Sequence, residues 1–313
     1  MASRTLGRVL LGLLVALAAS CATRPPPPVE TGQLFLWEVA RPDGKGGVAH
    51  LLGTVHLSQD ALHFDPAVEH ALAEAEWLVL EIDPSEMDPA VMQRVAGEIG
   101  FFQDGRTLDQ VVGPETWALL ATHTARLGMP AEGFRTFEPW FALLTLQMMA
   151  LEKQGFAPEQ GVERGLVGQA DDLGKPTRGL ETAAGQLGAF DTLPLDFQSR
   201  MLREFLQESA SGGAGSAGEG VAILIDAWRK GDAARIESEI FDQLERDPTL
   251  APYFENLYFR RNREMAGQIG DFIDTGGRWF VAVGAAHMVG ARGLPSLLAE
   301  QGYRVERVPK TVR

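Results

Sequence analysis

The stretch His50-Leu51-Leu52-Gly53-Thr54-Val55-His56 decides the fold of this chain. Its apolar residues are typical of a buried strand, and a glycine followed three residues later by a histidine closes it. A second stretch, Phe280-Val281-Ala282-Val283-Gly284-Ala285-Ala286-His287, repeats this design near the other end. Ligands of α/β proteins bind beyond the carboxyl ends of strands, where glycine allows a sharp turn. We therefore predict that His56 and His287 meet at one site.

Length and composition exclude several classes of function. The chain has 313 residues, 45% of them hydrophobic, which is enough apolar surface for a substantial core. Its formal net charge of −14 argues against a nucleic-acid partner, because a phosphate backbone requires a basic face. The single cysteine, Cys21, excludes a disulfide within the chain, a cysteine-rich zinc site and thiol catalysis in the body of the protein. The sequence also lacks Gly-x-Ser-x-Gly and phosphate-binding glycine motifs.

Residues 1–21 have the pattern of a signal peptide. Arg4 and Arg8 precede an apolar stretch that is too short to cross a membrane as a helix. The segment ends Leu17-Ala18-Ala19-Ser20-Cys21, which resembles the lipobox of bacterial lipoproteins, where the cysteine is lipidated. We expect Cys21 to anchor the chain at the bacterial cell envelope, at the outer membrane facing periplasm or exterior, with residues 22–33 as a proline-rich tether. An ordinary secretory signal cleaved nearby is the alternative.

The pattern of the mature chain predicts an α/β fold in a single domain over residues 34–313. Its N- and C-terminal parts supply the strands, and its middle part is helical. We expect strands at 34–39, 48–52, 77–80, 177–180, 279–283 and 303–308. We expect helices at 66–75, 114–127, 139–154, 195–207, 221–229, 233–244, 252–273 and 294–300. The Gly/Ser/Ala-rich segment 209–220 is expected to be a flexible loop.

Four polar residues lie at or just after the ends of short apolar strands: His56, Glu81, Glu181 and His287. Imidazole and carboxylate together are good ligands for a divalent metal ion. Two histidines and one or two glutamates, with an open position for water, would form a catalytic site, and a glutamate not used as a ligand could act as general base. Each residue alone also has a structural explanation, as a hydrogen-bonded core histidine, a solvated acid or a helix-capping acid. Both interpretations remain open at this level.

Several short motifs in one order resemble the TraB/GumN family, which includes the animal Tiki proteins and bacterial pheromone-shutdown proteins. They cover nearly the whole mature chain, and they are Leu36-Trp37-Glu38-Val39, Leu51 to His56, Leu80-Glu81, Pro139-Trp140, Gly161-Val162-Glu163, Gly179-Leu180-Glu181-Thr182, Arg261-Asn262 and Val283 to His287. The resemblance implies a central mixed sheet with a helical lid. It also implies a site made of His56, Glu81, Glu181 and His287, with Arg261 and Asn262 beside it. Glu163 stands where the family commonly has aspartate.

The resemblance also implies an activity, because the Tiki branch is regarded as metal-dependent proteases that favour manganese or cobalt over zinc. We therefore expect an envelope-anchored hydrolase of extracytoplasmic peptides or proteins. His56 and His287 would hold the metal with Glu81 or Glu181, the other glutamate would activate water, and Arg261 would stabilise an oxyanion or bind a substrate carboxylate. Two alternatives remain: a binding protein that sequesters a peptide or signal, and a metal-free His/Glu hydrolase like the erythromycin esterases.

Overall fold

The computed structural model describes residues 28–60, 62–210 and 214–311. Cys21 and the signal segment 1–21 lie outside these residues, as does the first part of the tether. The described chain forms two compact units, of which one comprises residues 87–155 and 183–220. The other comprises the described residues within 28–86, 156–182 and 221–311, and it contains the sheet.

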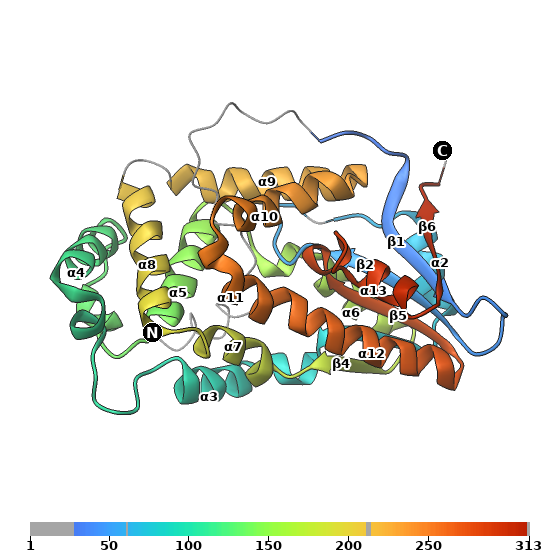
Figure 1. The fold of residues 1–313 in the computed structure, drawn as a ribbon, viewed down its shortest axis with the longest axis horizontal. Helices are drawn as coiled ribbons and strands as arrows, with labels where there is room; N and C mark the ends of the chain where they lie inside the picture. The colour runs from blue at the N-terminus through green and yellow to red at the C-terminus, as the bar shows by residue number, and fades with distance from the viewer. Residues whose placement is uncertain (1–27, 61, 211–213, 312–313) are drawn as a thin grey trace. The chain divides into compact units, whose positions relative to one another are not determined.

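Six strands form one mixed sheet in the order β4-β3-β5-β2-β1-β6 (Figure 1). They are β1 (Gln33–Ala40), β2 (Val48–Thr54), β3 (Trp77–Ile82), β4 (Thr177–Glu181), β5 (Arg278–Gly284) and β6 (Arg304–Pro309). The neighbours β2, β5, β3 and β4 run parallel, whereas β1 is antiparallel to both β2 and β6. The predicted α/β fold with a central mixed sheet is therefore confirmed. The four parallel strands end at the same edge of the sheet.

Helices of the sheet unit begin and end where local chemistry dictates. They are α2 (Pro66–Glu74), α6 (Val162–Asp172), α9 (Ala214–Lys230, of which Val221 onward belongs to this unit), α10 (Ala233–Arg246), α11 (Ala251–Phe254), α12 (Arg260–Thr275) and α13 (Leu294–Glu300). Helix α2 starts after Asp65, whose carboxylate accepts the Ala67 N–H at 2.9 Å, with proline at the first helical position. A π-helical turn, Glu255–Phe259, joins α11 to α12.

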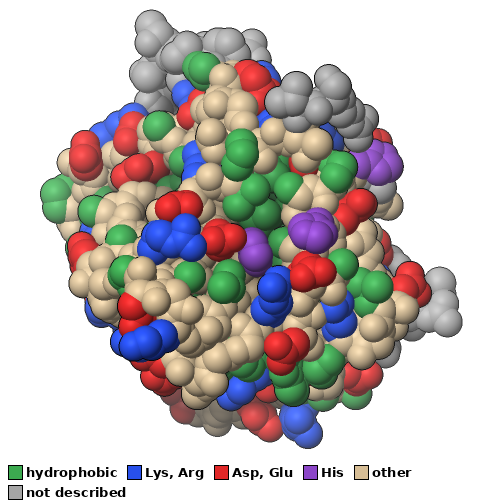
Figure 2. All heavy atoms as spheres, turned by 90° about the vertical axis from the view of Figure 1, so that its right-hand side faces the viewer, with side chains coloured by type: hydrophobic (Ala, Val, Ile, Leu, Met, Phe, Trp, Pro, Cys, Tyr) green, Lys and Arg blue, Asp and Glu red, His purple; other side chains and the backbone are tan. Residues whose placement is uncertain are grey.

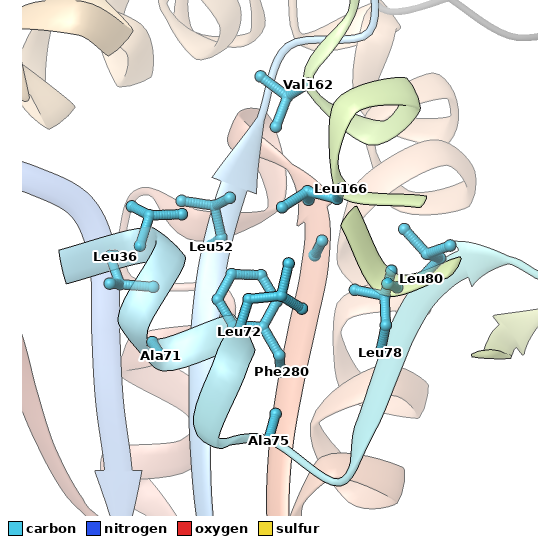
Figure 3. Close-up of a cluster of buried hydrophobic side chains, with 13 residues drawn as sticks. Leu36, Leu52, Ala71, Leu72, Ala75, Leu78, Leu80, Val162, Leu166 and Phe280 are labelled. Carbon is cyan, nitrogen blue, oxygen red and sulfur yellow. The ribbon is translucent and has the colours of Figure 1, made fainter. Parts of the chain in front are cut away.

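The core of this unit lies between the sheet and helices α2 and α6 (Figure 3). Leu52 of β2 and Phe280 of β5 pack with Leu72 of α2 in this fully buried cluster. Because side chains alternate along a strand, the intervening residues point to the other face. There Trp279 of β5 stacks on Phe272 of α12, with ring centroids 4.6 Å apart. Helix α12 therefore covers the face opposite to α2 and α6.

The second unit consists of helices α3 (Pro89–Ile99), α4 (Leu108–Arg126), α5 (Pro139–Lys153), α7 (Ala183–Asp191) and α8 (Leu195–Ala210). The expectation of a loop over residues 209–220 is wrong for its described part. Helix α8 continues to Ala210 and α9 begins at Ala214. Glycine and serine weaken a helix by only about 1 kcal/mol each, so neighbouring helical residues outweigh them where no proline intervenes.

The carboxyl of Glu138, just before α5, gives this unit a pH-dependent stability. Burial and the neighbouring Asp191 raise the pKa of Glu138 to about 7 from its ordinary value of 4.5. The folded state therefore holds a proton that the unfolded state releases, so this stabilisation is present below pH 4.5 and is lost as the pH rises through 7. We expect Glu138→Gln to flatten the fall in stability between pH 5 and pH 8 in urea unfolding. An unchanged pH profile would contradict this assignment.

Charged side chains of both signs are interspersed over one face of the molecule (Figure 2). Surface ion pairs of the sheet unit include Arg304 with Glu38 at 3.0 Å and Arg278 with Glu74 at 2.9 Å. Such exposed pairs contribute little to stability. Among the helices that the structure describes, none has both the length and the apolar character needed to cross a membrane.

Candidate functional site

The carboxyl ends of the parallel strands bring the four predicted residues together. His56 follows β2 by two positions, and His287 lies in the short 3₁₀ turn after β5. Glu81 is the penultimate residue of β3 and Glu181 is the last residue of β4. His287 Nε2 lies 3.9 Å from Glu81 Oε1, and one guanidinium bridges Glu81 and Glu181. The order of the strands thus brings four residues that are distant in sequence into one cluster.

Gly284 keeps open the space at the centre of this cluster. A Cβ atom at this position would lie 2.9 Å from His56 Nε2 and 3.1 Å from Glu81 Oε1. Its backbone N–H donates to Glu81 Oε1 at 2.6 Å. The glycine of the second Gly-x-x-His motif therefore both holds the Glu81 carboxylate and leaves room between carboxylate and imidazole.

Glu163, at the start of α6, is a site residue to which the sequence interpretation assigned no role. Its Oε1 lies 2.6 Å from His56 Nδ1, and it also accepts a hydrogen bond from the Thr54 hydroxyl. The backbone makes this possible, because Val162 N–H donates to the Val55 carbonyl at 3.0 Å and a Cβ on Gly161 would lie only 2.3 Å from the His56 carbonyl oxygen. In the sequence, only the motif Gly161-Val162-Glu163 pointed to this residue. The role of Glu163 as a partner of His56 follows from the contact seen in the structure.

His287 is held in one tautomer by Asn262. His287 Nδ1 lies 2.5 Å from Asn262 Oδ1, and the Asn262 amide nitrogen donates to the Arg292 carbonyl at 2.7 Å. Because the amide nitrogen is used by Arg292, the oxygen must accept a proton from His287 Nδ1. The other ring nitrogen, Nε2, is then an acceptor. It is completely buried and has no hydrogen-bond partner among the residues that the structure describes.

Arg261 of α12 bridges the two strand-end glutamates from a buried position. Its Nε donates to both Glu181 oxygens at 2.9 and 3.0 Å, and its Nη2 donates to Glu181 at 2.6 Å and to Glu81 Oε2 at 2.9 Å. Its Nη1 donates to the Leu257 carbonyl at 2.7 Å. Glu181 is thus engaged by the guanidinium, whereas Glu81 keeps Oε1 directed toward the histidines. The two glutamates have different surroundings.

The two histidines differ in charge because their neighbours differ. Burial lowers the pKa of His287 to about 3, since the attraction of Glu81 does not compensate for lost solvation. Burial also lowers the pKa of His56, but the charge and hydrogen bond of Glu163, with the charge of Glu81, outweigh it and raise that pKa to about 9. Burial raises the pKa of Glu81, but His287, Arg261 and His56 together lower it to about 2. At neutral pH the site thus contains an ionised Glu81, a protonated His56 and a neutral His287.

The donor atoms of this cluster do not form a complete metal cage as the side chains stand. In the described part of the chain, no group of three or more His, Cys, Asp or Glu residues is arranged to hold a metal ion. The atoms nearest to such an arrangement are His287 Nε2 and Glu81 Oε1, 3.9 Å apart, and His56 Nε2 across Gly284. Two ligands of one ion, each at about 2.1 Å, can be at most roughly 4.2 Å apart. The 3.9 Å between His287 Nε2 and Glu81 Oε1 is below this limit.

Glu163→Gln tests whether Glu163 orients His56 for metal binding. Removing the charge weakens the hydrogen bond to His56 Nδ1 and relaxes the ring, and loss of such a supporting carboxylate typically costs about 10- to 100-fold in metal affinity. We expect this loss in a calorimetric titration with Mn²⁺ or Co²⁺. Glu159→Gln, an exposed acid shortly before α6, serves as the control and should bind like the wild type. Equal affinities for both variants would remove this role from Glu163.

Comparison with known proteins agrees with the sequence motifs. The profile of the TraB/PrgY/gumN family matches residues 35–307. The uncharacterized protein YbaP of Shigella flexneri is 25% identical over 263 residues, covering 80% of this chain and 87% of the relative. YbaP of Escherichia coli (strain K12) is 25% identical over 262 residues with the same coverage. No solved structure is significantly similar to the chain. The family profile spans almost the whole sheet and both Gly-x-x-His motifs, and the chain therefore belongs to the TraB/PrgY/gumN family.

Proposed function

We propose that this protein is a metal-dependent hydrolase in which His56, His287 and Glu81 hold a divalent ion, with manganese, cobalt and zinc as candidates. The proposal rests on His287 Nε2, a fully buried acceptor that forms no hydrogen bond with any described residue and lies 3.9 Å from an ionised oxygen, Glu81 Oε1. A buried polar atom without a hydrogen bond is costly unless a bound group satisfies it. The space preserved by Gly284 lies between His56 Nε2 and the same Glu81 oxygen.

The charge balance of the cluster also favours a cation. Three buried or partly buried carboxylates, Glu81, Glu163 and Glu181, surround the guanidinium of Arg261 and the two imidazoles. Neutral imidazoles with a carboxylate suit ions of intermediate hardness. Glu163 and Asn262 keep the Nδ1 protons in place. The Nε2 lone pair of His287 is then available to the ion, whereas that of His56 becomes available when the ion displaces the second proton of this imidazole.

The bound ion would lower the pKa of water and polarise a substrate carbonyl. The chain's own residues then have separate roles. Glu81 is assigned to the ion through Oε1, because Oε2 is held by Arg261. Glu181 is assigned to holding Arg261, because its two oxygens accept from the guanidinium. Arg261 is thus a positioning residue for Glu81, in place of the oxyanion role expected from the resemblance.

The substrate class we propose is peptides or proteins of the cell envelope. This part rests on the likeness to the Tiki branch and on the lipobox-like sequence that ends in Cys21. A chain lipidated at Cys21 would be held at the membrane surface by its acyl groups alone. Palmitate labelling of the wild type, compared with Cys21→Ala, tests the anchor independently of the activity.

The test of the proposed function uses the full chain in detergent. The wild type is titrated with Mn²⁺, Co²⁺ and Zn²⁺, and the metal-loaded protein is incubated with unfolded casein before and after treatment with a chelator. We expect one ion per chain and cleavage that chelation abolishes and Mn²⁺ or Co²⁺ restores. Cleavage that survives complete removal of metal would overturn the proposal in favour of His/Glu hydrolysis. A stoichiometric complex with intact peptide would overturn it in favour of a sequestering protein.

A further inference from the structure

Tyr258 is a buried polar residue that the proposed function does not use. It lies in the π-helical turn Glu255–Phe259, and only 2% of its surface is exposed. Its ring packs against the ring of His287, with centroids 5.5 Å apart. Within the described residues its hydroxyl forms no hydrogen bond. Single π turns occur frequently at functional sites, because the wider turn redirects side chains.

The ring of Tyr258 is fixed on its other sides by aromatic neighbours. Phe241 of α10 meets it edge-on at 5.2 Å, and Phe254 of α11 stacks on it at 5.8 Å. These contacts leave the ring little freedom to turn away from His287. The next turn of the helix carries Arg261, and residues three apart share one helix face. Tyr258 is therefore held rigidly against the His287 ring, shortly before Arg261 in the chain.

In two adjoining rings, the Tyr258 hydroxyl and His287 Nε2 form no hydrogen bond with a described residue, and the His287 nitrogen is completely buried. They are chemically complementary to different parts of one bound species. The imidazole nitrogen is an electron-pair donor that suits a cation, whereas the phenol is a hydrogen-bond donor that suits an anionic oxygen.

We propose that Tyr258 is a catalytic hydrogen-bond donor that binds an anionic oxygen of the substrate at the His56/His287/Glu81 site. The inference rests on the proposed function, because it requires an ion at that site. It assigns to Tyr258 the oxyanion role for which Arg261, engaged with two carboxylates, is not free. The hydroxyl donates without transferring its proton, so no bond to Tyr258 forms or breaks.

The variant Tyr258→Phe tests this role, because it keeps the ring contacts and removes only the hydroxyl. The full chain is loaded with Co²⁺ and titrated with methylphosphonate, a tetrahedral anion. A hydrogen bond to a charged group is worth about 1.5 kcal/mol or more, so we expect at least a roughly tenfold weaker affinity for methylphosphonate with unchanged Co²⁺ affinity. On casein, kcat should fall while KM stays constant. Tyr253→Phe, the same change one turn earlier, is the matched control and should behave like the wild type.

The outcomes separate this inference from the proposed function. Failure of the wild type to bind Co²⁺ would overturn both. Normal Co²⁺ binding with equal methylphosphonate affinity in wild type and Tyr258→Phe would overturn only the role of the hydroxyl. If the Co²⁺-loaded wild type does not bind methylphosphonate, the role of the Tyr258 hydroxyl is likewise overturned, and the proposed metal site is not. If Tyr258→Phe folds but loses Co²⁺ affinity, the residue acts through the His287 ring, and the donor role is wrong.

Discussion

His287→Ala should abolish stoichiometric binding of Mn²⁺ and Co²⁺ while the protein remains folded. The substitution removes Nε2, the buried acceptor beside Glu81, which no other described side chain contacts by a hydrogen bond. Loss of a supporting residue of a metal site costs about 10- to 100-fold in affinity, so loss of a ligand itself should cost more than about 100-fold. Calorimetric titration measures the affinity, and circular dichroism checks the fold.

The matched control for this variant is His50→Ala. His50 lies within β2, close in sequence to the first motif, but its Nε2 faces the surface residue Glu38 at 3.6 Å. Its removal should leave metal affinity and casein cleavage unchanged. Retention of full metal affinity in His287→Ala would mean that the unpaired nitrogen has another purpose, and the proposed metal site would then be wrong.

Arg261→Leu should lower the free energy of unfolding by about 3–5 kcal/mol, because it removes one partner from a buried ion-pair network. Arg261 is 3% exposed and donates to Glu81 and Glu181, so the variant leaves two carboxylates without their counter-charge. The loss should shrink as the pH falls, since protonation of the glutamates then relieves the unpaired charge. Urea unfolding at pH 5 and pH 8 measures both effects.

Two further variants make this prediction specific. Adding Glu181→Gln to Arg261→Leu removes one of the unpaired charges and should recover part of the lost stability. Arg263→Leu, on the same helix, removes an exposed guanidinium whose partner is Glu255, and it should change stability by at most about 1 kcal/mol. Equal losses for Arg261→Leu and Arg263→Leu would show that the buried network does not stabilise the fold.

Much of the sheet and part of the site were determined by the sequence alone. The apolar strands, the Asp65-Pro66 start of α2 and the two Gly-x-x-His motifs are local patterns that depend on residues close together in the chain. Parallel strands end at one edge of a sheet, so residues placed after strand ends, such as His56 and His287, could be expected to meet.

The partners of those residues were decided only by tertiary structure. Glu163 reaches His56 because α6 docks on the residues after β2, and Arg261 reaches Glu81 and Glu181 because α12 covers that face of the sheet. These contacts join segments distant in sequence, and no local spacing encodes them. The sequence by itself thus determined which residues stand at the strand ends. Helix packing decided which of them hold a charge, a proton or an unpaired nitrogen, because burial and close neighbours set the pKa values and hydrogen bonds.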